Sequence, residues 1–167
     1  EGRRALVTGA NTGIGQGIAL ALAEAGAIVV AAGRSSMAET QKLITEAGGT
    51  CLPLQVDLQQ NGIAGRVIDE AQALAGPLDI LVNNAGIIRR ADALDFSESD
   101  WDEVMNLNLK ANFFLAQAFA KAALATGRTG RIVNIASLLS FQGGIRIPSY
   151  TASKSGLAAL TRLLACE

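Results

Sequence analysis

The sequence predicts an α/β protein with a doubly wound parallel sheet, three layers deep, with helices on both faces of the sheet. Three observations lead to this prediction. Short, continuous apolar runs alternate with helix-like segments, each connection is long enough for a helical crossover, and a glycine-rich turn follows the first run. The 167 residues, half of them hydrophobic, suit a single domain, residues 1–167, with a sizeable core.

The expected elements follow one another as five βα units. The strands are residues 5–7, 27–32, 51–56, 78–82 and 131–135. The helices are residues 13–25, 38–47, 62–75, 97–125 and about 149 to 167. Gly26 and Gly48 are stop signals for the first two helices, and Ser97 with Asp100 resembles a capping box. Right-handed units in this order place a ligand at the carboxyl ends of the strands, where the strand order reverses.

Composition excludes several classes of function. The net charge of −1 gives no basic surface for nucleic acid or for a membrane. The chain has no histidine, which removes Ser-His-Asp and Cys-His catalysis, and Cys51 and Cys166 alone cannot form a zinc site or a disulfide framework. No apolar run reaches the roughly 18 residues of a membrane span. We therefore expect a cytoplasmic enzyme or binding domain.

The turn between the first strand and the first helix has the composition of a phosphate-binding loop. Its glycines let the backbone bend sharply and approach a ligand, and the helix N-terminus offers free N–H groups to a pyrophosphate. The alternative is that they are ordinary turn glycines. The candidate cofactor-binding residues of this turn are Gly9, Asn11, Thr12, Gly13, Ile14 and Gly15.

The end of the second strand bears on the choice of cofactor. An acidic residue here would bind the ribose 2′-OH of NAD, whereas an arginine suits a 2′-phosphate. This chain has Arg34 and Ser35 and no acid, so NADP(H) is slightly favoured over NAD(H). A solvated loop charge is the alternative for Arg34.

Tyr150, the only tyrosine, lies four residues before Lys154 and therefore on the same face of the last helix. A neighbouring ammonium group favours the phenolate and lowers the pKa of the phenol, so that Tyr150 can act as a general acid or base. Ser137, after the fifth strand, can hydrogen-bond the reacting oxygen. The alternative, for each feature taken alone, is that Tyr150 and Lys154 are an ordinary surface pair and that Ser137 is a turn residue.

Five motifs in this order resemble the short-chain dehydrogenase/reductase family along the whole chain. They are T-G-x-x-x-G-I-G, Asn83-Asn84-Ala85-Gly86, Asn108, Ser137 and Tyr150-x-x-x-Lys154. The resemblance implies a Rossmann fold, a nicotinamide cofactor and catalysis by Tyr150. It also implies that Lys154 binds the cofactor ribose and that Asn108 holds a water that extends a proton relay to Lys154. The further cofactor contacts that it implies are Asp57, Leu58, Asn84, Ala85, Gly86, Tyr150 and Lys154.

Positive charges gather where a substrate would lie. The candidate substrate residues are Arg89, Ser137, Gln142 and Arg146, and a carboxylate would find bidentate partners in Arg89, its neighbour Arg90 and Arg146. The alternative for each arginine is a solvated loop charge. The segments I-R-R-x-D-A-L and S-F-Q-G-G-I-R-x-P-S-Y are similar to the branch of the family that acts on keto-deoxy sugar acids in uronic-acid breakdown. That branch would lead us to expect an NAD-type pocket, which Arg34 does not match. The alternatives are a 3-oxoacyl-carrier-protein reductase-like enzyme and a non-catalytic cofactor-binding scaffold.

The expected long helix is apolar nearly all round over residues 113–120, so we expect it to be buried on more than one side. The resemblance implies a homodimer or homotetramer that pairs through helix 97–125 and the last helix; burial within its own chain is the alternative. It also implies that the fold is C-terminally incomplete, because relatives continue past residue 167. We expect the fifth strand to be an exposed edge and the 167-residue chain alone to be poorly soluble and inactive.

Overall fold

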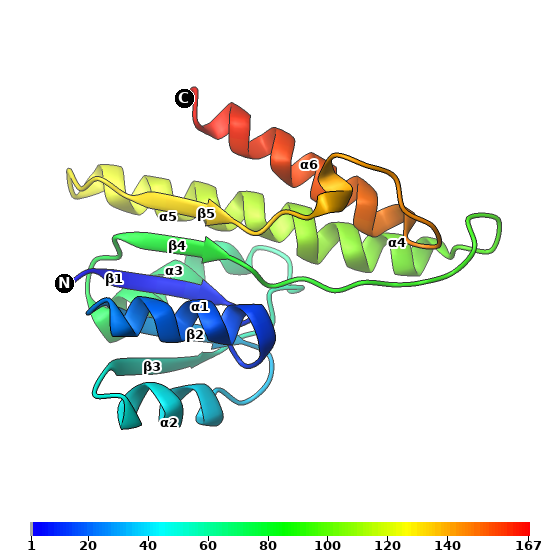
Figure 1. Ribbon diagram of the computed structural model, residues 1–167. Coiled ribbons are helices and arrows are strands. Elements are labelled where there is room, and N and C mark those ends of the chain that lie inside the picture. The colour runs from blue at the N-terminus through cyan, green and yellow to red at the C-terminus, as the bar shows by residue number, and fades with distance from the viewer. Residues whose placement is uncertain (1) are drawn as a thin grey trace.

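A computed structural model describes residues 2–167 and contains one parallel five-stranded sheet with the order β3-β2-β1-β4-β5 (Figure 1). The strands are β1 (Arg4–Thr8), β2 (Ile28–Gly33), β3 (Thr50–Gln55), β4 (Ile80–Asn83) and β5 (Arg131–Asn134). The chain order reverses between β1 and β4, which are paired in register from Ala5 opposite Ile80 to Val7 opposite Val82. The predicted doubly wound sheet is confirmed, and its switch point lies between β1 and β4.

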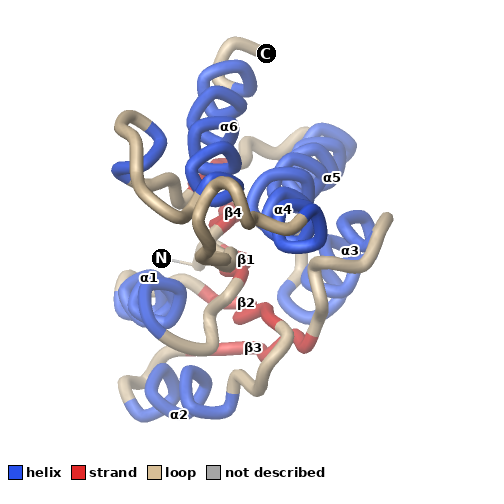
Figure 2. The backbone as a smooth tube through the Cα atoms, turned by 90° about the vertical axis from the view of Figure 1, so that its right-hand side faces the viewer, coloured by secondary structure: helices blue, strands red, loops and turns tan. Residues whose placement is uncertain are grey.

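Helices cover both faces of the sheet and make the predicted three layers (Figure 2). They are α1 (Gly13–Glu24), α2 (Ala38–Glu46), α3 (Ile63–Ala75), α4 (Glu98–Met105), α5 (Asn112–Ala125) and α6 (Pro148–Leu164). Leu6 packs toward α3 and α5, and its neighbour Val7 packs toward α1 and α2. Because successive strand residues point to opposite faces, both must be apolar, which explains the continuous apolar runs.

The expected helix 97–125 is interrupted, so the prediction of one regular helix was wrong in its middle. A π-helical segment, Asn106–Ala111, joins α4 to α5 without a break in the chain direction. Inside it, the backbone carbonyl of Asn108 accepts a 2.8 Å hydrogen bond from the Asn112 side chain. This wider turn adds a residue to the helix and redirects Asn108 into the interior, where its side chain is fully buried.

The predicted start of α4 is confirmed, since the Ser97 side chain accepts a 3.1 Å hydrogen bond from the Asp100 N–H. A short 3-10 helix that the sequence analysis missed, η2 (Leu138–Ser140), follows β5. The last helix, α6, packs against α4, the π-helical segment and η2, and β5 lies at the edge of the sheet. Within residues 2–167, none of the helices has both the length and the apolar character needed to cross a bilayer.

Candidate functional site

The glycine turn lies at the carboxyl end of β1, next to the switch point of the sheet. Gly13 has φ +59, in the left-handed region that glycine adopts without strain. A Cβ atom at Gly15 would lie 2.2 Å from the Gly9 carbonyl oxygen, so only glycine fits there. Within the described residues, no side chain caps the first turn of α1, and this turn carries no acid. The N–H groups of α1 are therefore free for an anionic ligand.

Thr8 and Asn84 brace this turn against the end of β4. The Thr8 hydroxyl accepts hydrogen bonds of 3.0 Å from the N–H groups of both Asn84 and Ala85. The Asn84 side chain donates to the carbonyl oxygens of Thr8 and Gly9, at 2.9 and 3.2 Å. Asn84 therefore holds the loop in shape. Thr8 is not among the predicted site residues. Its position directly before the first glycine is the sequence signal that could have identified it.

A cleft of about 170 Å³ opens beside the turn and brings together residues from four loops. Eight of the predicted cofactor residues line it: Gly9, Asn11, Arg34, Ser35, Asp57, Leu58, Ala85 and Gly86. Arg34 and Ser35 are exposed, so their donors are available to a ligand. The Leu58 side chain belongs to the core, which leaves its backbone for contact. The Asp57 carboxylate accepts a 3.0 Å hydrogen bond from the Gln59 N–H.

These features fit a nicotinamide dinucleotide. The free N–H groups of α1 and the glycine backbone, which has no Cβ atoms, can bind a pyrophosphate. The side chains of Arg34 and Ser35 can donate hydrogen bonds to the adenosine ribose and its substituents. Four predicted residues of the turn and α1, namely Thr12, Gly13, Ile14 and Gly15, do not line the cleft. Ile14 is exposed at the start of α1, and Gly15 shapes the turn through its small size.

Tyr150 and Lys154 lie on one face of α6, and the Lys154 ammonium group lies 5.8 Å from the centre of the Tyr150 ring. Lys154 is 3% exposed, and its Nζ donates a 2.5 Å hydrogen bond to the carbonyl oxygen of Ile135 at the end of β5. Burial lowers the pKa of Lys154 below its ordinary value of 10.5. The ammonium group is thus held beside the phenol by the backbone of the sheet.

Ser137 begins the 3-10 turn that lies against α6. Its hydroxyl oxygen accepts a 3.2 Å hydrogen bond from the Leu139 N–H, so its own O–H remains able to donate. Ser140 links this turn to α6, because its hydroxyl accepts from the Ser137 N–H at 3.2 Å and donates to the Lys154 carbonyl at 2.7 Å. Ser140 is not among the residues predicted from the sequence, since a serine three residues after another forms no recognisable motif.

Asn108 joins α6 to the loop after β4. Its Nδ2 donates to the carbonyl oxygen of Ile87 at 2.8 Å and to the Ser153 hydroxyl at 3.3 Å. The Ser153 hydroxyl in turn donates to the Tyr150 carbonyl at 2.9 Å. The Asn108 side chain is therefore fully engaged with protein groups, so the expected relay water would have to be held by another part of the residue.

Two of the predicted substrate arginines are already paired. The Arg89 guanidinium lies 2.7 Å from the Glu103 carboxylate and 3.5 Å from that of Asp100. The Arg146 guanidinium lies 3.1 Å from the Asp92 carboxylate. Gln142 is exposed on the loop between η2 and α6. The structure brings these residues to the same end of the sheet as Tyr150, but Arg89 and Arg146 face acids of their own chain.

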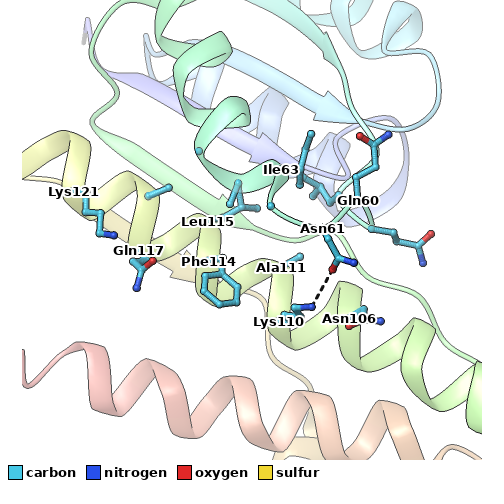
Figure 3. Close-up of a pocket in the computed structure, with 16 residues that line it drawn as sticks. Gln60, Asn61, Ile63, Asn106, Lys110, Ala111, Phe114, Leu115, Gln117 and Lys121 are labelled. Carbon is cyan, nitrogen blue, oxygen red and sulfur yellow. Dashed lines mark hydrogen bonds between the residues drawn. The ribbon is translucent and has the colours of Figure 1, made fainter.

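A larger groove, of about 610 Å³, lies between α5 and the segment that leads into α3 (Figure 3). Phe114 is 43% exposed there and points into the groove beside Ala111, and the Lys110 ammonium donates a 3.0 Å hydrogen bond to the Asn61 side chain. None of the catalytic candidates Asn108, Ser137, Tyr150 and Lys154 lines it. Its apolar floor and polar rim are typical of a protein–protein interface.

Comparison with known proteins agrees with this geometry. A family model described as short chain dehydrogenase matches residues 3–167. The 2-dehydro-3-deoxy-D-gluconate 5-dehydrogenase of Escherichia coli K12 is 55% identical over 167 residues, which are 100% of this chain and 66% of that protein. The chain thus spans just under two thirds of that relative's length.

Two solved structures are similar along 99% of the chain. A candidate 2-deoxy-D-gluconate 3-dehydrogenase from Agrobacterium tumefaciens, solved with bound NADP, is 60% identical with a TM-score of 0.91, and the match covers 65% of it. A candidate NAD(P)-dependent gluconate 5-dehydrogenase from Beutenbergia cavernae, with NADP at low occupancy, is 46% identical with a TM-score of 0.92, and the match covers 66% of it. The sugar-acid resemblance of the motifs is confirmed at the level of these relatives. The chain belongs to the short-chain dehydrogenase family.

Proposed function

We propose that this chain carries the cofactor site and the catalytic residues of an NAD(P)-dependent oxidoreductase that interconverts a hydroxy and a keto group on a deoxy sugar acid. The observation that carries the proposal is the Tyr150–Lys154 pair, with a buried ammonium group 5.8 Å from the phenol ring. The names of the E. coli and A. tumefaciens relatives support the substrate class.

The cofactor is held at the α1 turn and in the adjoining cleft, and a nicotinamide dinucleotide bound there supplies or accepts the hydride. The backbone of Gly9 and Gly13 and the N–H groups of α1 bind its pyrophosphate. Arg34 and Ser35 bind a 2′-phosphate, which favours NADP(H) over NAD(H). The two NADP-bound structures support this preference. A strong preference for NADH that Arg34→Ala leaves unchanged would remove it.

Proton transfer belongs to Tyr150. During reduction its phenol gives a proton to the oxygen of the substrate, and during oxidation the phenolate removes the hydroxyl proton. The Lys154 ammonium stabilises the phenolate, and the Ile135 carbonyl keeps it in place. The Ser137 hydroxyl accepts from Leu139 and donates to the same substrate oxygen, which stabilises the charge that develops there.

A substrate panel tests this proposal against its alternatives. Nicotinamide absorbance is followed with keto-deoxy sugar acids and with acetoacetyl thioesters, for the full-length protein that contains this chain and for its Tyr150→Phe variant. We expect turnover of the sugar acids and a loss of about 10²- to 10⁴-fold in the variant, because the general acid is removed. Preference for the thioesters would indicate a 3-oxoacyl reductase. Cofactor binding without turnover of any substrate would indicate a scaffold.

The protein also associates with a second copy of itself, through the groove between α5 and α3 and through α6, as a homodimer or homotetramer. The supporting observation is the exposed Phe114, which stands on an apolar floor between Lys110 and Lys121. Phe114→Glu places a charge in this floor, and we expect smaller particles in sedimentation velocity. Leu124→Glu, an exposed apolar position on the same helix outside the groove, is the matched control. Equal behaviour of both variants contradicts this interface.

A further inference from the structure

Two loops meet beside the start of the catalytic helix. The segment after β4, residues 84–96, meets the segment before α6, residues 141–147, near the start of α6 (Figure 1). The Ala91 N–H donates a 3.1 Å hydrogen bond to the Arg146 carbonyl oxygen, and the Arg146 side chain reaches back to Asp92. The residues next to Ala91 therefore lie against the segment that leads into α6, four residues before Tyr150.

Arg146 is held in an unusual conformation by these contacts. Its φ of +64 lies in the left-handed region, which an arginine adopts only where its surroundings impose it. Its carbonyl and its guanidinium are both used to hold the segment after β4. Arg146 is thus a positioning residue, and its charge is balanced by Asp92.

Arg89 is also fully occupied. Its guanidinium is bound to Glu103, lies within ion-pair distance of Asp100, and donates a 3.2 Å hydrogen bond to the carbonyl oxygen of Ile88. A substrate carboxylate would have to displace these acids and leave their charges without a partner. The contacts of the Arg89 guanidinium tie the loop to α4, and this structural role explains all of its hydrogen bonds and ion pairs.

Arg90 differs from both neighbours. It is exposed, and it forms no ion pair or side-chain hydrogen bond with any of residues 2–167. Its planar group keeps all five donors free, in a geometry that matches a carboxylate. Asp95 of the same segment and Glu98 at the start of α4 come five and eight residues later, and Asp92 is paired with Arg146. The free positive charge of this loop is therefore that of Arg90.

We propose that Arg90, and not Arg89 or Arg146, binds the carboxylate of the substrate and so selects sugar acids over neutral sugars. This inference rests on the proposed function, since it assigns one group of that substrate to one side chain. Two ion pairs hold this loop on either side of Arg90: Arg89 with Glu103 before it, and Asp92 with Arg146 after it. An arginine without a partner loses no existing interaction when the carboxylate arrives.

The test compares a keto-deoxy sugar acid with its neutral analogue, in which a hydroxymethyl group replaces the carboxylate. For Arg90→Gln we expect the KM for the acid to rise about 10- to 100-fold, because a charge-assisted hydrogen bond to the carboxylate is lost. The kcat should change much less. The KM for the neutral analogue should stay within about twofold. Arg90→Lys should recover part of the effect, because it restores the charge but not the fork of donors. Arg66→Gln, an exposed arginine of α3, is the control.

Each outcome decides the assignment. Equal changes in KM for the acid and the neutral analogue, or no change for either, overturn it. A selective loss for the acid in Arg89→Gln, with cofactor affinity intact, assigns the role to Arg89 instead. If the unaltered protein turns over no sugar acid, the proposed function fails and this inference fails with it. If it does turn over sugar acids and Arg90→Gln matches it, only the assignment of Arg90 fails. Cofactor affinity and the circular dichroism spectrum verify that each variant is folded.

Discussion

Asn108 and Ile87 form a reciprocal hydrogen-bonded pair. The Ile87 N–H donates to Oδ1 of Asn108 and the Asn108 Nδ2 donates to the Ile87 carbonyl oxygen, both at 2.8 Å. A side-chain amide presents a donor and an acceptor side by side, as a neighbouring strand would, and so it satisfies both backbone groups just past the end of β4. The π-helical segment aims Asn108 at this loop, and Ser153 connects the pair to the Tyr150 helix.

Asn108→Ala should destabilise the protein by about 2–3 kcal/mol, because it leaves the N–H and C=O of Ile87 without partners in a half-buried loop. Urea denaturation measures the change. Asn106→Ala, an exposed position in the same π-helical segment, should stay within about 0.5 kcal/mol of the unaltered protein. Similar losses at both positions would mean that the helix, and not the pair with Ile87, accounts for the effect.

Gly15→Ala should abolish tight cofactor binding, with Kd raised about 10-fold or more, since the new methyl group would lie 2.2 Å from the Gly9 carbonyl oxygen and force the turn to shift. Gly17→Ala, two residues on in α1, has no described heavy atom within 4 Å of its Cβ position. It should leave binding unchanged and stabilise the helix by about 1 kcal/mol. Fluorescence titration with NADPH compares the two; unaltered affinity in Gly15→Ala would contradict the role given to the turn.

Asp79, 4% exposed just before β4, anchors the N-terminal end of the sheet. Burial raises the pKa of its carboxyl, but the Arg4 N–H and the guanidinium groups of Arg128 and Arg3 outweigh burial and hold the pKa below its ordinary value of 3.8. The stability from this carboxylate is therefore present above pH 3.8 and is lost as the pH falls through the lowered pKa.

Asp79→Asn should thus lower the free energy of unfolding by about 2–3 kcal/mol at pH 7, with a difference that shrinks only below about pH 3.8. Guanidinium denaturation at several pH values measures it. Asp69→Asn, which removes an exposed carboxylate from α3, is the control and should stay within about 0.5 kcal/mol of the unaltered protein at pH 7. A difference that already declines between pH 7 and pH 5 would rule out a lowered pKa.

Lys154 should produce a pH dependence of the same sign on the alkaline side, although its buried charge is unfavourable to the fold whereas that of Asp79 is favourable. Burial lowers its pKa in the fold, so between that value and 10.5 the unfolded chain binds more protons than the folded one. The unfavourable contribution of the buried charge is complete below the lowered pKa and diminishes as the pH rises toward 10.5. The stability of the unaltered protein should therefore rise relative to Lys154→Met over this range, as denaturation at pH 8 to 10.5 will measure. A constant difference would mean that the pKa is not lowered.

Local sequence determined the order of strands and helices and the position of the phosphate-binding turn. Successive strand residues point to opposite faces of the sheet, so a run such as Ala5-Leu6-Val7 must be apolar throughout. Gly13 has a positive φ, and Gly15 lies too close to the Gly9 carbonyl for a Cβ atom, so both requirements arise within the same turn. Tyr150 and Lys154 share a face because four residues make about one helical turn. These features depend on neighbours in the chain, so their spacing is visible in the sequence.

Only the tertiary structure decided which groups are free and which are already bound. A buried amide needs hydrogen-bond partners, and those of Asn108, in the π-helical segment, lie 21 and 45 residues away, at Ile87 and Ser153. The sequence does not distinguish Arg89, Arg90 and Arg146 from one another. In the fold, Arg89 and Arg146 each lie beside a carboxylate, whereas Arg90 does not. A charge pair depends on distances in space, which residue spacing does not contain.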